Sequence, residues 1–106
     1  MTYEELKALD SITCEVTQDD IDNGRRAVSS ACPIALAINR TLGLEPRSSI
    51  VGLKDFNLGE INVHASHQSH FNQTFSHTPE SGQFVMDFDD GKKVEPATFI
   101  LKRWPQ

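Results

Sequence analysis

Residues 32–43 read CPIALAINRTLG, and this stretch decides the fold because it predicts one buried helix. Pro33 suits the first turn of a helix, where its missing N–H is not needed, and Gly43 suits the position just after one. Between them, the run IALAI is apolar on nearly every side. A helix with no polar face has to be covered from more than one direction. We therefore expect residues 32–42 to form the central helix, with a sheet on one side and other elements beyond it.

Two short elements are predicted ahead of this helix. Residues 12–16 alternate apolar and polar side chains and include β-branched ones, which is typical of a half-buried strand. Thr17 can cap the backbone N–H of residue 20 and so begin a short helix that Gly24 ends. A similar capping signal at the start of the chain predicts a peripheral helical arm at residues 1–10.

The rest of the chain predicts a sheet and one more long helix. Strands are indicated at residues 48–53, 60–65 and 97–102, with a further short one at 71–75. The apolar stripe FVMDF at 84–88 predicts a helix over residues 79–90 that Gly91 ends. Helices segregated from a mostly antiparallel sheet of about four strands define an α+β fold. We expect this sheet to pack against the helices at 32–42 and 79–90.

Size and composition indicate a single domain. With 106 residues, 38% hydrophobic and 24% charged, the chain resembles an ordinary globular protein. Two separate cores would each be hard to stabilise without a metal or disulfides. We therefore expect residues 1–106 to form one domain, either a monomer or a homodimer.

The charge balance favours a basic partner. Fifteen acidic and ten basic residues give a net charge of -5, whereas domains that bind nucleic acid directly carry a basic surface. Residues 1–10 do not read as a signal peptide, and no stretch of the sequence approaches the roughly 18 apolar residues of a membrane span. We expect a cytoplasmic protein that contacts neither a membrane nor bare nucleic acid.

The two cysteines and the absence of catalytic motifs argue against an enzyme. In a cytoplasmic chain, Cys14 and Cys32 are expected to be reduced and buried. Cys32 stands just before a helix, where an exposed thiol would be activated, but its apolar neighbours predict burial. The sequence has no phosphate-binding loop, nucleophile elbow or dinucleotide fingerprint. We expect a non-enzymatic protein without a cofactor.

All four histidines fall within one fifteen-residue stretch, VHASHQSHFNQTFSH, which starts at residue 63. They are His64, His67, His70 and His77. On a helix the first three would lie along one side, whereas a strand would point the middle one away from its neighbours. The segment is poor in helix formers and matches no zinc signature, so a polar surface hairpin is the favoured interpretation. A metal site built from these four residues, or a pH or ligand role, remains the alternative.

Acidic residues gather near two of the predicted helices, and they are the favoured candidates for partner binding. The first cluster is Asp19, Asp20 and Asp22, and the second is Asp87, Asp89 and Asp90. Such clusters can imitate a run of phosphates for a basic partner. The first also suits the N-terminus of its helix, whereas carboxylates at a helix C-terminus are unfavourable and call for another explanation.

A small-ligand or signal-nucleotide sponge is the alternative of a different class. It would need a pocket with basic and aromatic side chains. The candidates are Arg25, Arg26, Phe71 and Phe75.

Three blocks of the sequence, VTQDDIDNG, CPIALAINR and FDDGKKVEPATFIL, resemble a family of small uncharacterised phage and prophage proteins. The family pattern runs V-T-x-x-x-I-x-x-G, then C-P-[IV]-A-L-A, then F-D-x-G-x-x-V-x-P-x-x-F, and the match covers residues 16–101. Members often have a cysteine where this chain has Ser29, so a Cys-x-x-Cys site is not expected here.

This resemblance implies a phage accessory protein that acts in the cytoplasm of a bacterial host. Small acidic products of that kind are frequently inhibitors of bacterial defence, of the anti-CRISPR type. The partner that the resemblance implies is therefore a host protein, or a protein–nucleic acid complex, with a basic surface.

Overall fold

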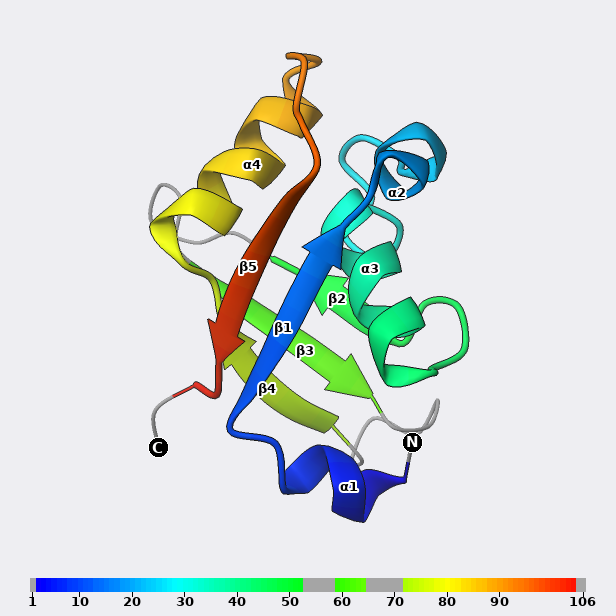
Figure 1. Cartoon of the computed structure of the whole chain (residues 1–106), viewed down its shortest axis with the longest axis vertical. Coiled ribbons are helices and arrows are strands. Elements are labelled where there is room, and N and C mark those ends of the chain that lie inside the picture. Colours follow the sequence, from blue (N-terminus) through cyan, green and yellow to red (C-terminus); the bar gives the residue numbers. More distant parts are fainter. Residues whose placement is uncertain (1, 53–58, 65–71, 105–106) are drawn as a thin grey trace.

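The computed structural model describes residues 2–52, 59–64 and 72–104, and within these ranges it has the α+β fold expected from the sequence. The described residues form four helices and five strands, whose arrangement can be followed in Figure 1. The helices are α1 (Tyr3–Lys7), α2 (Gln18–Asn23), α3 (Pro33–Leu42) and α4 (Pro79–Asp89). The strands are β1 (Ser11–Val16), β2 (Ser49–Val51), β3 (Glu60–His64), β4 (Asn72–Ser76) and β5 (Ala97–Lys102). Residues 53, 65 and 71 of the predicted strands lie outside the described ranges.

The strands form two small antiparallel sheets, where the sequence suggested one. β1 pairs with β5 from Ser11↔Lys102 to Val16↔Ala97, and β3 lies between β2 and β4 in the second sheet. The sheets meet at one corner, where Phe75 forms an isolated bridge with Arg103 and the N–H of Trp104 donates to the carbonyl of Thr74. Beyond this corner β4 and β5 diverge, so the β1–β5 pair crosses over the other sheet (Figure 1).

Helix α3 is the central helix that the sequence predicted. It contacts one strand from each sheet, β1 and β2, as well as α2. Ile34, Ala35, Ala37 and Ile38 are fully buried. Pro33 occupies its first turn, and Gly43 ends it in the left-handed conformation, with φ 65°. The helix therefore closes one side of the core between the two sheets.

The helical arm predicted at residues 1–10 contains helix α1, and one of its residues reaches the core. Helix α1 is short, and a capping box between Thr2 and Glu5 begins it. Its Leu6 is fully buried in the main core, while the helix lies against β4. One well-placed leucine thus anchors the segment to the domain.

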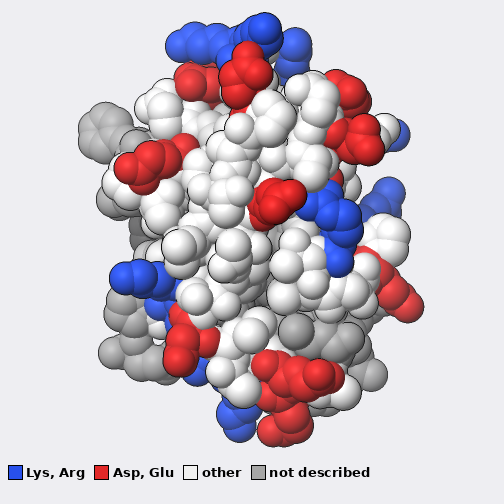
Figure 2. Space-filling model, in the orientation of Figure 1, with Lys and Arg blue, Asp and Glu red and all other residues white. Residues whose placement is uncertain are grey.

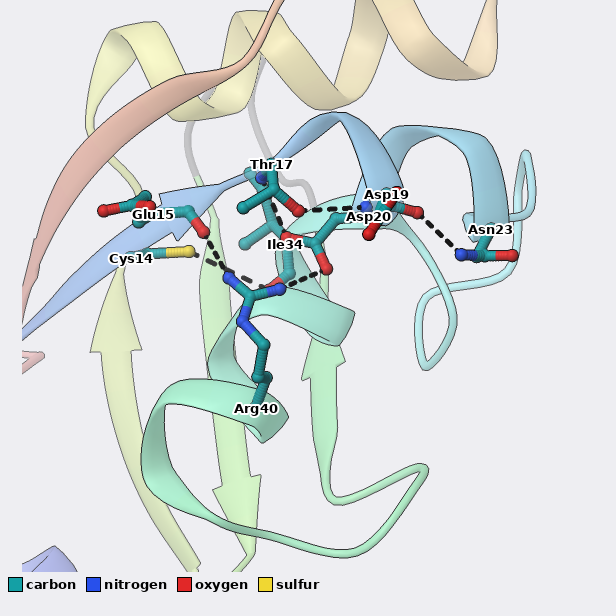
Figure 3. Close-up of polar contacts among 8 residues, drawn as sticks. All are labelled: Cys14, Glu15, Thr17, Asp19, Asp20, Asn23, Ile34 and Arg40. Carbon is teal, nitrogen blue, oxygen red and sulfur yellow. Dashed lines mark hydrogen bonds and ion pairs between the residues drawn. The ribbon is translucent and has the colours of Figure 1, made fainter.

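A polar clamp joins β1, α2 and α3 (Figure 3). Arg40 of α3 donates to the Asp20 carboxylate at 2.5 Å and to the carbonyl oxygen of Glu15, at the end of β1, at 2.6 Å. The same carboxylate accepts the N–H of Thr17 at 2.9 Å, and the Thr17 hydroxyl accepts the N–H of Asp20. The predicted capping box therefore begins α2 and also holds the carboxylate for Arg40. The hydrogen bond with Asp20 raises the pKa of Arg40, so the guanidinium stays charged.

Helix α4 follows its prediction closely at both ends. Thr78 caps it through the N–H of Ser81, and Pro79 occupies its first turn. Asp90 is its last partly helical residue, and Gly91 follows with φ 79°. No helix in the described ranges is both long and apolar enough to cross a membrane.

We predict that Arg40→Met destabilises the fold by about 2 kcal/mol, because it leaves the buried Asp20 carboxylate without its cation and the Glu15 carbonyl without a donor. The free energy of unfolding in urea measures this loss. Arg25→Met is the matched control, since the Arg25 side chain is exposed, and it should change stability by only about 0.5 kcal/mol or less. Equal stability of the two variants would show that the clamp contributes nothing.

Candidate functional site

A groove of about 530 Å³ lies between helix α4 and strand β5, and we call it the α4–β5 groove. Its lining comes from α4, from the loop that follows it and from β5. The lining residues are Pro79, Glu80, Gln83, Phe84, Asp87, Lys93, Val94, Glu95 and Phe99. Its volume exceeds those of the other two hollows described in this section.

One face of α4 builds the helical wall of this groove. Glu80, Gln83, Phe84 and Asp87 are spaced at i, i+3, i+4 and i+7, which places them on the same side of a helix. Phe84 meets Phe99 of β5 edge to face, with ring centroids 5.6 Å apart. These two rings are largely buried, and with Val94 they give the groove an apolar floor.

The rim of the α4–β5 groove is acidic. Three carboxylates line it, on Glu80, Asp87 and Glu95, against one cation, Lys93. Lys93 lies 3.4 Å from Glu95, so these two charges largely offset each other. Asp87 accepts a hydrogen bond from the Gln83 amide at 2.9 Å and has Lys92 at 3.8 Å. Figure 2 shows the same face of the molecule, where an uncharged strip follows β5 and most charged side chains lie at its margins.

The second predicted acidic cluster is divided, because Asp89 lies apart from Asp87. Asp87 lines the α4–β5 groove. Asp89 points to another side, where it accepts the N–H of Ala27 at 2.9 Å and lines a smaller hollow beside Cys32. Asp90 caps the helix end and is exposed. Asp89 is therefore not positioned to act with Asp87.

One residue of the first predicted acidic cluster, Asp20, is buried. Asp20 is only 5% exposed and is held by Arg40 and Thr17, so it is unsuited to contact a partner. Asp19 and Asp22 are exposed on α2, where Asp22 accepts a hydrogen bond from Gln18. Sequence reasoning missed the role of Asp20 because Arg40 lies twenty positions away.

A basic hollow of about 370 Å³ separates the two acidic regions. Its lining is Gln18, Ile21, Arg26, Phe88, Gly91, Lys92, Lys93 and Val94. The Arg26 guanidinium packs against Gly91, where an added Cβ would lie 3.1 Å from Arg26 Nη1. The two acidic clusters therefore do not merge into a continuous phosphate-like surface.

The predicted ligand set is only partly brought together. Arg26 lines the basic hollow, but Arg25 does not, although its side chain is exposed. Phe75 is fully buried in the core and cannot stack on a ligand. Phe71 lies outside the described residues.

The histidines do not gather in the part of the chain that the structure describes. His64 ends β3 and pairs with residue 72 of β4, so the antiparallel hairpin predicted for this segment is present. His77 is only 6% exposed, which makes the surface interpretation wrong for this residue. His67 and His70 lie outside the described residues. Within the described ranges no three His, Cys, Asp or Glu side chains are grouped to hold a metal ion.

His77 forms a buried pair with Ser81 that the sequence did not reveal. Its Nδ1 lies 2.8 Å from the Ser81 hydroxyl, which also accepts the N–H of Thr78 at 2.9 Å. A contact between a histidine Nδ1 and a serine hydroxyl is also found where a base activates a nucleophile. Ser81, however, is fully buried, so a substrate cannot reach it. The pair instead fixes the start of α4. The sequence signal that could have indicated this role of Ser81 is its place three residues after the capping Thr78.

The two cysteines are buried and unpaired, as the sequence predicted. Burial raises the pKa of the Cys14 thiol to about 12 and that of Cys32 to about 11. Cys32 precedes α3 without capping it through its side chain. Neither thiol is therefore ionised at neutral pH, and a nucleophilic role has no support from their surroundings.

Comparison of the chain with protein-family models, with curated proteins and with solved structures found no significant match. Its role therefore has to be inferred from its own residues.

We predict that His77 contributes to acid sensitivity. Burial lowers the pKa of His77 below its ordinary 6.5, so the unfolded chain binds a proton there more tightly than the folded one. The free energy of unfolding should therefore fall as the pH is lowered through about 6.5, and His77→Gln should remove part of this fall. Urea denaturation of both proteins between pH 8 and pH 5 measures it. Parallel pH profiles would contradict the prediction.

Proposed function

We propose that this protein acts by binding stoichiometrically to a protein with a basic surface, and that the α4–β5 groove is the binding site. The observation that carries the proposal is the combination of an apolar floor with an acidic rim. Interfaces of this kind pair a desolvated apolar centre, which supplies affinity, with a charged margin, which supplies orientation and speed of encounter.

The rim selects the chemistry of the partner. The three carboxylates of the rim outnumber Lys93 and the neighbouring Lys92, so the rim repels phosphate groups and attracts lysine and arginine side chains. The net charge of -5 acts in the same direction over the whole surface. Phe84 and Phe99 supply the apolar area, so the favoured partner segment carries both apolar and basic residues.

A catalytic role has less support than binding. The thiols of Cys14 and Cys32 are buried and un-ionised, and the His77–Ser81 pair is enclosed. The α4–β5 groove contains carboxylates, a lysine and an amide, and its described lining includes no serine, threonine, cysteine or histidine. Its side chains suit recognition better than chemistry.

The resemblance of three sequence blocks to phage and prophage proteins suggests what the partner does. On that basis we propose that the protein inhibits a component of bacterial defence in the cytoplasm of the host, in the manner of an anti-CRISPR protein. A defence protein that handles nucleic acid carries the basic surface that the acidic rim would attract.

The basic hollow supports a second candidate, the binding of a small anionic ligand such as a signal nucleotide. Three cations surround it, on Arg26, Lys92 and Lys93. A native mass spectrum of protein purified from bacterial cells tests this alternative. We expect a retained ligand to add a defined mass that Arg26→Ala loses and Arg25→Ala keeps; a parent protein without added mass would argue against it.

Two matched double variants test the proposed function. The groove variant combines Glu80→Gln with Asp87→Asn. Glu80 lies in the first turn of α4, and Asp87 accepts a hydrogen bond from the glutamine four residues before it. The control variant combines Asp19→Asn with Asp22→Asn on α2, away from the groove. Asp19 likewise lies in the first turn of its helix, and Asp22 accepts a hydrogen bond from the glutamine four residues before it. Both change the net charge equally, so they separate a local effect from a general one.

We predict that only the groove variant slows association with the host protein that the immobilised parent captures. At low salt its association rate should fall by about threefold or more, and the difference should shrink as salt screens the charges. Surface plasmon resonance at two ionic strengths measures the rates. A groove variant that associates as fast as the parent at low salt would overturn the proposal.

A further inference from the structure

Strand β5 borders the α4–β5 groove through Phe99, and its edge away from β1 lies on the side of α4 (Figure 1). The N–H of Arg103 donates to the carbonyl of Asp10 at 2.9 Å, so this residue directs its backbone groups at the β1 side. In an antiparallel ladder this direction repeats at every second residue. The backbone groups of Leu101 and Phe99 therefore face β1 as well, and those of Ile100 and Thr98 face the opposite way.

Strand β1 confirms this alternation from the other side of the pair. Glu15 is the register partner of Thr98. Its carbonyl faces away from β5 and accepts a hydrogen bond from Arg40. The groups of Glu15 and Thr98 thus point outward from opposite edges of the same two-stranded sheet.

Over its middle residues, the outer edge of β5 has no strand partner in the part of the chain that the structure describes. Among the described residues, β5 meets β4 just past its own end, at the bridge between Phe75 and Arg103. Within the described ranges no other strand pairs with Thr98 or Ile100. Natural edge strands are commonly blocked by lysine or proline, and here Pro96 and Lys102 stand only at the two ends. Between them, Ile100 is 55% exposed.

A groove with an open strand edge on one side and a helix on the other is suited to hold an extended peptide. Such a peptide gains backbone hydrogen bonds from the strand and places alternate side chains against the helix. The helical wall here is the face of α4 that carries Glu80, Phe84 and Asp87.

We propose that an extended, basic segment of the partner adds to the outer edge of β5 as a third strand of the β1–β5 sheet. Its apolar side chains rest on Phe84 and Phe99, and its lysine or arginine side chains meet the acidic rim. This inference rests on the proposed function and specifies how the partner is held. A second copy of this chain is disfavoured as the occupant, because a symmetric pairing of β5 edges would bring two acidic rims together.

Amide hydrogen exchange of the parent protein tests strand addition directly. The probe is a synthetic peptide of alternating lysine and valine, as long as β5, and an equivalent peptide of glutamate and valine is its control. We expect the lysine peptide to slow exchange at Thr98 and Ile100 by about tenfold or more at saturation. Phe99 and Leu101 already face β1, so they serve as internal references and should change little.

N-methylation of the peptide adds a test that leaves the protein unaltered. Only every second peptide N–H can face β5. One of the two alternately methylated lysine–valine peptides should therefore lose binding by about tenfold or more, while the other keeps it. Equal binding of both, peptide binding without protection of Thr98 and Ile100, or no binding would each overturn strand addition. If Thr98 and Ile100 are protected from exchange without peptide, and more so at higher protein concentration, the partner at the β5 edge is a second copy of this chain.

The two proposals fail in different ways. If the groove variant still associates slowly with the host protein while the peptide protects neither amide, only strand addition is wrong. If the groove variant associates with the host protein as fast as the parent, the proposed function itself fails.

Discussion

The guanidinium of Arg40 holds the outer edge of β1 against helix α3. It takes the outward carbonyl of Glu15 on β1 and at the same time neutralises the buried carboxylate of Asp20, so one side chain ties a strand to two helices. The edge of β1 is covered in this way by α3 and its arginine, whereas within the described ranges the middle of β5 has no strand partner on the opposite edge. The α4–β5 groove lies on that opposite side.

Local signals were sufficient to predict the helices. Thr17 and Thr78 cap the helices they precede, Pro33 starts α3 and Gly43 ends it, and each of these acts over a few residues. The division into two sheets could not be predicted in the same way. It depends on β5 pairing with β1 from the other end of the chain and on a single bridge between Phe75 and Arg103, and alternation within a strand carries no information about its partner.

The candidate site could be predicted only in part, because the sequence shows which residues are charged but not which of them are buried. Asp87 was identified as acidic, and the helical spacing from Glu80 to Asp87 would have added the rest of that face. Glu95 and Phe99 join them only through the turn after α4. Asp20 and Asp89 looked like their neighbours, yet one is buried beside Arg40 and the other holds the N–H of Ala27, sixty-two positions away.

The register of β1 with β5 also bears on mechanical strength. Ser11, where the chain enters β1, lies opposite Lys102, where it leaves β5, and Arg103 donates to the carbonyl of Lys7 beside them. Force applied along the chain from these two points would open the hydrogen bonds one after another, as a zipper, instead of shearing them together. A protein-unfolding motor that pulls on either flank would therefore meet little resistance from this sheet, however stable the domain is to heat or urea.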